Sequence, residues 1–352
     1  MTKLSILNLV PKYIGESYKD AYDRALKLAQ FADKNNFQRY WLTEHHNSPA
    51  VISSATEVVI SYILAHTKNI RIGAGGVMLP NHSLFQVAER YACLNNLYKD
   101  RIDLGLGRAP GTDKDTARLL YKKNFSPREF INATKMLKLY FSEDVEKLDV
   151  KPYPQTREIP LYILGTSTIS AHIAGKLGLP YAFAGQVSPD LIEKAFDIYR
   201  TEFIPSRQLE KPYTILSLIT NIARTKEDAK DLSIKAEQIF LQIMNVKEKS
   251  EFYNLDPENA PELTSIERFL IKTNRGLSIN GDVEYARKEL LKINEKYKAD
   301  EIMALSFINE YEKLEDNFRI LKDIVDNSLW QIIKLTSRIL NLKSVKIKFP
   351  IL

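Results

Sequence analysis

Short apolar runs and longer amphipathic segments alternate along this chain up to about residue 325. The apolar runs are nearly continuous, which is typical of parallel strands that are covered on both faces. Between them, apolar residues recur three or four positions apart, which predicts helices at 17–35, 84–98 and 188–203. The predicted strands are 4–10, 38–43, 70–75, 101–107, 160–165, 180–185, 213–223 and 300–305.

Eight strands that alternate with helices indicate an α/β protein, either a closed barrel or a large doubly wound sheet. The pattern favours a single (β/α)8 TIM barrel that spans residues 1–327. Two connections, 108–159 and 224–299, are much longer than the others and follow the fourth and seventh strands. Long insertions of this kind serve as lids or binding loops, or are surface elaborations without a function.

The end of the chain has a different pattern. Residues 311–325 are predicted to form the closing helix of the barrel, and residues 328–352 a basic amphipathic tail. Such a tail can lie on a membrane surface, but packing on its own barrel or on a second subunit is the favoured interpretation.

Composition narrows the class of protein. The 352 residues are 44% hydrophobic and 27% charged, with a net charge of +6 and a pI near 9.0, as in a soluble globular protein. Lysines are spread along the chain, so we expect a solvated basic surface and no nucleic-acid partner. No stretch approaches the ~20 apolar residues of a membrane helix. The single cysteine, Cys93, excludes an internal disulfide, is expected in the core, and fits a cytoplasmic protein.

In a parallel barrel, functional side chains come from the carboxyl ends of the strands. His45 and His46 follow the second strand, and an imidazole suits proton transfer near neutral pH. Because successive strand residues point to opposite faces, only one of the two is expected at the barrel mouth. Adjacent histidines are a poor chelate and no HExxH spacing occurs, so we predict no metal site.

Glycines gather after the third strand, in Gly73-Ala74-Gly75-Gly76. They predict either a tight turn or a place where the backbone approaches a flat ligand.

After the fourth strand, the segment 105–111 (GLGRAPG) nearly spells a dinucleotide-binding fingerprint. Its third glycine is one place late and a proline occupies the turn, so we reject that interpretation. Arg108 remains as a candidate, since a guanidinium at a strand end can clamp a phosphate; a surface salt bridge is the alternative.

Hydroxyl side chains cluster after the fifth strand. Thr166, Ser167 and Ser170 lie where a strand passes into a helix, and the free N–H groups of a helix N-terminus bind anions. Helix capping would explain one of these hydroxyls but not all of them, so anion binding is favoured.

Four segments occur in the order YWLTEHHN, IRIGAGGVMLPNH, DRIDLGLGRAPGTD and PLYILGTSTISAHIAGKLGLPYAFA. Together they resemble the bacterial luciferase-like monooxygenase family, in particular its uncharacterised branch near the alkanal monooxygenases. The resemblance covers roughly residues 3–325. It implies a (β/α)8 barrel that uses FMN.

The resemblance also implies roles for individual positions. His45 matches the active-site histidine beside the flavin, and Arg108 the arginine that grips the FMN phosphate. Thr166, Ser167 and Ser170 match the phosphate-binding turn. Gly75 and Gly76 match a pair whose non-proline cis peptide backs the isoalloxazine ring.

Two positions depart from luciferase itself. Gly107 stands where luciferase has a cysteine beside the flavin, and Thr166 where it has a glutamate. Both differences argue against light emission and leave FMN binding unaffected.

The implied function is that of a two-component monooxygenase. It would use O2 and reduced FMN, supplied by a separate flavin reductase, on a small organic substrate such as an aldehyde or ketone. The family also implies a homodimer. Two alternatives stay open: a deazaflavin-dependent oxidoreductase that does not use O2, and a non-catalytic flavin-binding protein.

Overall fold

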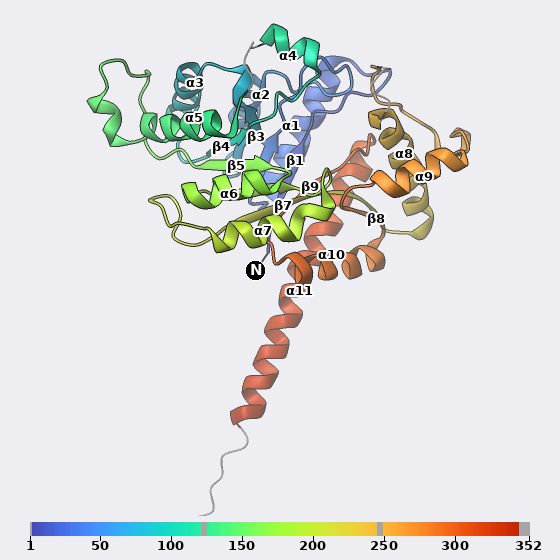
Figure 1. Cartoon of the computed structure of the whole chain (residues 1–352). Helices are drawn as coiled ribbons and strands as arrows, with labels where there is room; N and C mark the ends of the chain where they lie inside the picture. Colours follow the sequence, from blue (N-terminus) through green and yellow to red (C-terminus); the bar gives the residue numbers. More distant parts are fainter. Residues whose placement is uncertain (1, 121–124, 245–248, 345–352) are drawn as a thin grey trace, which may run out of the picture.

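Eight parallel strands close into a barrel in the computed structural model, with helices outside it (Figure 1). The structure describes residues 2–344 apart from 121–124 and 245–248, and side chains as far as residue 327. Each barrel strand pairs with its neighbours, and β9 returns to β1. The predicted barrel and its eight strands are confirmed. They are β1 Lys3–Asn8, β2 Arg39–Leu42, β3 Arg71–Met78, β4 Ile102–Gly107, β5 Leu161–Gly165, β6 Tyr181–Ala184, β7 Thr214–Ala223 and β9 Glu301–Leu305.

The main core lies between the outer face of the barrel and the surrounding helices. Tyr40 and Leu42 of β2 point outward into this layer and are fully buried. The first helix begins at a capping box in which Ser17 and Asp20 bond each other's backbone N–H groups. The outer helices are α1 Tyr18–Lys34, α2 Thr56–Ala65, α3 Leu84–Leu97, α5 Pro127–Tyr140, α6 Thr168–Leu177, α7 Ile192–Thr201, α10 Val283–Tyr297 and α11 Tyr311–Ser344.

The two long connections add elements beyond the basic barrel. The first adds α4 (Lys114–Leu120) before α5, and the second adds α8 (Lys226–Met244) and α9 (Ser265–Asn274). The second also contains β8 (Ser278–Asp282), which pairs with the carboxyl half of β7. Strand β8 was not predicted, because its sequence SINGD contains one apolar residue, Ile279, and so has no apolar run.

Cys93 corrects one expectation. It is exposed on α3 and not part of the core. The buried stripe of this helix runs through Val87, Tyr91 and Leu94, and a residue two positions after Tyr91 falls on the opposite side of the helix.

The closing helix α11 runs past residue 325 to Ser344, so the predicted start of the tail at residue 328 falls inside a helix. The side chains of the predicted amphipathic tail lie outside those described, and its role stays a prediction. Within the described residues, no helix combines the length and apolar character needed to cross a membrane.

Candidate active site

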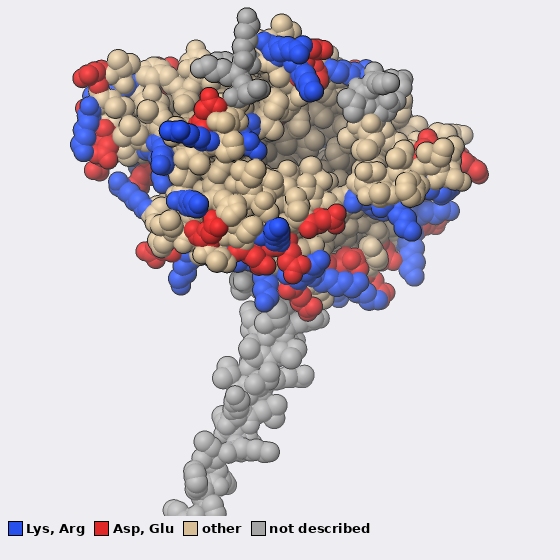
Figure 2. All heavy atoms as spheres, in the orientation of Figure 1, with Lys and Arg blue, Asp and Glu red and all other residues tan. Residues whose placement is uncertain are grey.

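A cavity of about 280 Å³ opens at the carboxyl ends of the barrel strands. Among the described residues that line it, the two ionisable ones are His45 and Arg108, and both were predicted from the sequence. Gly75, Thr166, Ser167 and Ser170 also line it, whereas Gly76 does not. In the space-filling view, a hollow opens below α4 in a largely uncharged surface, while charges of both signs mix along the lower edge (Figure 2).

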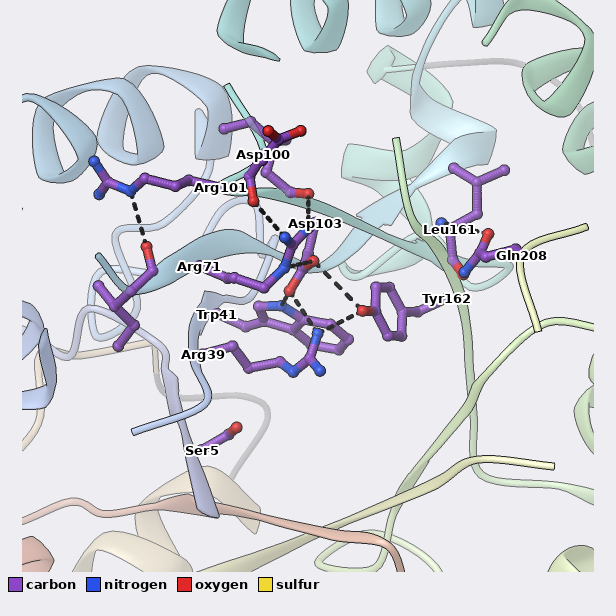
Figure 3. Close-up of polar contacts among 12 residues, drawn as sticks. Ser5, Arg39, Trp41, Arg71, Asp100, Arg101, Asp103, Leu161, Tyr162 and Gln208 are labelled. Atoms are coloured by element: carbon purple, nitrogen blue, oxygen red, sulfur yellow. Dashed lines mark hydrogen bonds and ion pairs between the residues drawn. The ribbon is translucent and has the colours of Figure 1, made fainter. Parts of the chain in front are cut away.

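A buried network of charged side chains lies within the barrel, and Figure 3 shows its contacts among Arg39, Arg71 and Asp103. Arg39 donates to Asp103 at 2.6 Å and to Glu301 at 2.9 Å, and all three are nearly or fully buried. Arg71 donates to the second Asp103 oxygen at 2.8 Å. Burial alone would raise the pKa of Asp103, but Arg39 and Arg71 hold it below its usual value. Asp103 thus stays ionised, and the lower barrel holds paired charge.

Trp41 forms the floor between this network and the cavity. Its indole N–H donates to Asp103 Oδ2 at 3.0 Å, and its ring packs edge-on against Tyr162. On the cavity side it lies against Gly75, where an added Cβ would fall 2.7 Å from the Trp41 ring. Gly76 packs against the Gly105 carbonyl instead, and the Gly75–Gly76 peptide is cis, as the resemblance implied. Gly75 therefore brings backbone to the cavity wall at a place where no side chain fits.

The side chains of the two adjacent histidines point in different directions, as the alternation of side chains along β2 predicts. Trp41, Thr43 and His45 line the cavity, whereas His46 turns away from it. Burial lowers the pKa of His45, so the imidazole is mainly neutral at pH 7. A neutral imidazole can donate one hydrogen bond and accept another, which suits proton transfer at the cavity wall.

Behind His45, Glu44 anchors the loops at the mouth, a role that sequence reasoning missed. This fully buried carboxylate is 2.9 Å from His46 Nε2 and 2.9 Å from His82 Nε2, and it accepts from the Met78 N–H and from Asn81. Burial would raise the pKa of Glu44, but these hydrogen bonds lower it to about 2. Glu44, His46 and His82 thus form a hydrogen-bonded cluster. Among the described residues, no group of three His, Cys, Asp or Glu side chains is placed to hold a metal ion.

Arg108 extends from the end of β4 into the cavity wall. Among the described residues, it has no carboxylate partner and no hydrogen bond, unlike Arg39 and Arg71 below it. A half-buried guanidinium without a counter-ion favours an anionic ligand. The alternative of a surface salt bridge finds no support within the described part of the chain.

The predicted anion-binding turn lies between β5 and α6. Ser167 occupies the N-cap position of α6, and its side chain makes no capping hydrogen bond. The first N–H groups of α6 are thus available to a ligand in the cavity. Ser170 differs from the expectation, because its hydroxyl bonds the Ser167 carbonyl at 2.7 Å and the Tyr181 hydroxyl at 2.9 Å. Gly165 permits this turn, since a Cβ there would lie 1.9 Å from Ser170 Oγ.

These features fit a flat ligand that carries a phosphate, as FMN does. An unpaired arginine and a free helix N-terminus supply the anion site at the ends of β4 and β5. A side-chain-free wall at Gly75, above Trp41, supplies a surface for a planar ring. His45 places a neutral acid or base at the same cavity.

Comparison with known proteins agrees with this geometry. The family model described as "Luciferase-like monooxygenase" matches residues 5–268. The chain is 39% identical to the uncharacterized protein YddN of Bacillus subtilis, over 92% of this chain and 96% of that one. It is 36% identical to an Escherichia coli protein named luciferase-like monooxygenase, over 92% and 97% of the two chains.

Among solved structures, apo-MsnO8 superposes with a TM-score of 0.84 at 28% identity, covering 93% of this chain and 99% of that one. Fold, site and sequence relatives thus agree: the chain belongs to the luciferase-like monooxygenase family, whose members are flavin-dependent.

Proposed function

We propose that this protein is an FMN-dependent monooxygenase that takes reduced FMN into the barrel-mouth cavity. One observation carries the proposal: the unpaired guanidinium of Arg108 and the uncapped N-terminus of α6 line the same cavity. A 31% identical relative is named N-acetyl-S-alkylcysteine monooxygenase. A structural neighbour that shares the fold, an oxygenating component of 3,6-diketocamphane monooxygenase, was solved with FMN.

Each group in the cavity has a proposed task. Arg108, Thr166, Ser167 and the first N–H groups of α6 bind the phosphate, and Ser170 holds their turn in place. The backbone of Gly75 and Gly76, with Trp41 behind it, orients the ring. Reduced FMN supplies the electrons with which O2 is activated. His45 holds or moves a proton at the reacting edge, and the apolar walls exclude water.

We propose a small aldehyde or ketone as the substrate class and a separate flavin reductase as the source of reduced FMN. Gly105 and Gly107 lie within strand β4 and not in a strand-to-helix turn, so segment 105–111 is not a dinucleotide-binding loop. This agrees with a separate reductase as the source of reduced FMN.

We also propose a homodimer through α2 and α3. Val58, Tyr62 and Leu97 of these two helices are exposed and border one open groove together with Cys93. A second copy of this surface would cover these apolar side chains.

The test is an equilibrium titration with oxidised FMN and, without oxygen, with reduced FMN, followed by flavin fluorescence and absorbance. We expect tighter binding of reduced than of oxidised FMN. A deazaflavin cofactor serves as the comparator. Binding of the deazaflavin alone would replace the proposal by a deazaflavin-dependent oxidoreductase. Binding of FMN in both redox states with no oxygen-dependent product would instead indicate a flavin-binding protein without catalysis.

A further inference from the structure

Two polar side chains in the cavity wall lack partners. Ser217 of β7 is 6% exposed, and its hydroxyl has no hydrogen bond within the described protein. The same holds for the buried side-chain oxygen of Gln186, which follows β6. Both residues line the cavity. A buried polar atom without a partner costs stability, so two in one wall indicate a ligand that completes them.

Their position separates them from the groups assigned to FMN. Those groups lie in or directly after strands β2 to β5, whereas Ser217 lies in β7 and Gln186 lies just after β6. A ring held against Gly75, with its phosphate at Arg108, leaves the β6–β7 wall to face the rest of the cavity. This wall therefore adjoins the space that the second reactant must occupy.

The charge of the wall limits what can bind there. Among the described lining residues, Arg108 is the one permanent cation, and the phosphate uses it. The β6–β7 wall offers a hydroxyl, an amide and apolar side chains such as Ile215 and Met303. Nothing on it would stabilise a second anion or a cation. The complementary group is thus neutral and carries both a hydrogen-bond acceptor and a donor.

A second pocket lies further along β7, lined by apolar side chains together with the charged Glu237 and Arg275. Ile215 and Ser217 line the main cavity, and Ile219 lines a smaller pocket of about 50 Å³ beneath α8 and α9, with Phe240 and Phe307. The second long connection is fastened beside it, since the Leu277 N–H donates to the Gly185 carbonyl at 3.0 Å. Within the main cavity, Ile215 and Met303 lie beside Ser217, so the polar pair has an apolar border there.

We propose that Ser217 and Gln186 form the substrate-recognition site. It selects a neutral carbonyl compound with an N–H or O–H donor, such as a hydroxyketone, and disfavours the free acid. Ser217 donates to the substrate carbonyl, and the Gln186 side-chain oxygen accepts from the donor. This site rests on the proposed function, because reduced FMN bound at Arg108 defines which part of the cavity stays open.

The test uses three probes of equal chain length: hexanamide, methyl hexanoate and hexanoate. Each is titrated into the FMN-loaded protein and into the flavin-free protein, by calorimetry and by the absorbance of bound FMN. Wild type should bind hexanamide at least tenfold more tightly than hexanoate, with the ester between them. Ser217→Ala should weaken hexanamide binding at least fivefold, leave FMN affinity within twofold, and not lower the melting temperature. Gln186→Leu should act in the same direction.

Ser188→Ala is the matched control, because this nearby hydroxyl does not line the cavity. Equal affinity for hexanamide and hexanoate, or no binding of hexanamide, would overturn the proposed class. A loss of FMN affinity in Ser217→Ala would make Ser217 a flavin contact and overturn its role here. If wild type does not bind FMN, the proposed function fails by itself, and the flavin-free titration decides the recognition site by the same comparison.

Discussion

At the scale of residues, neighbouring side chains of one type have opposite tasks because their surroundings differ. Arg39 and Arg71 are paired with carboxylates under the floor, while Arg108 at the mouth has no carboxylate partner among the described residues. His45 faces the cavity, and His46, the next residue, is held by Glu44. The residue type thus limits which functions are available, and the presence or absence of a hydrogen-bond or ion-pair partner indicates which of them applies.

Arg108→Ala should weaken FMN affinity by about 1.5–3 kcal/mol, or roughly 10- to 150-fold, because a charged hydrogen bond to the phosphate is lost. Equilibrium titration with FMN measures this. Arg118→Ala is the matched control, since this exposed arginine on α4 pairs only with Asp115 in the described structure. Equal affinities of all three proteins would refute the phosphate assignment.

His45→Ala should keep its affinity for FMN and lose most turnover, because the imidazole acts on a proton and does not hold the phosphate. Turnover is measured as product formed from a test aldehyde with reductase-supplied reduced FMN. Unchanged turnover would remove His45 from the mechanism.

Glu44 should make stability depend on pH. Its pKa falls from 4.5 to about 2 in the folded protein, which corresponds to about 3 kcal/mol. A depressed carboxylate pKa stabilises the fold above about pH 4.5, and this stabilisation is lost as the pH falls towards 2. Denaturant unfolding of wild type and Glu44→Gln should therefore differ most at pH 6 and converge as the pH falls from about 4.5 towards 2. A difference independent of pH would show that the carboxylate charge is not responsible.

At the scale of elements, the β5–α6 unit carries both an anion site and a structural cap. Gly165 begins the unit at the cavity, and Gly178 ends α6 in a left-handed conformation with φ of 63°. The two glycines lie on either side of α6, Gly165 at the end of β5 and Gly178 after the last turn of the helix, and substitutions at them should separate ligand binding from stability.

Gly165→Ala should weaken FMN binding about tenfold or more, since the new Cβ would displace Ser170 and the first turn of α6. Gly178→Ala should leave FMN affinity unchanged and lower the melting temperature by about 2–4 °C or more, because alanine is strained there and would meet the Ile204 carbonyl. FMN titration and thermal unfolding of both variants test this. An unaltered FMN affinity in Gly165→Ala would show that the turn does not bind the ligand.

At the scale of the whole molecule, much of the fold could be predicted because parallel strands buried on both faces leave long apolar runs. Strand β8 could not be predicted in this way. Its sequence, SINGD, pairs with the carboxyl half of β7 outside the barrel, where a strand does not need a long apolar run. Single polar residues leave no periodic signal either. The role of Glu44 follows from the hydrogen-bond partners that surround it in the structure. The role proposed for Ser217 follows from the lack of a partner for its hydroxyl among the described residues.

The proposed dimer is also a property of the whole molecule. Leu97→Glu should convert a dimer into a monomer, because Leu97 is 64% exposed on α3 and a charge there would be buried in the interface. Analytical ultracentrifugation measures the mass. Leu119→Glu, at an exposed site on α4, is the control. A wild type that sediments as a monomer would exclude this interface.

The most direct test of the central claim is the reoxidation of bound reduced FMN. Anaerobic protein loaded with reduced FMN is mixed with oxygenated buffer in a stopped-flow instrument, and the return of oxidised FMN is followed by absorbance. If the cavity binds reduced FMN and controls its reaction with O2, oxidised FMN returns in more than one phase and at rates unlike those of free FMN. A single phase at the rate of free FMN would contradict the account.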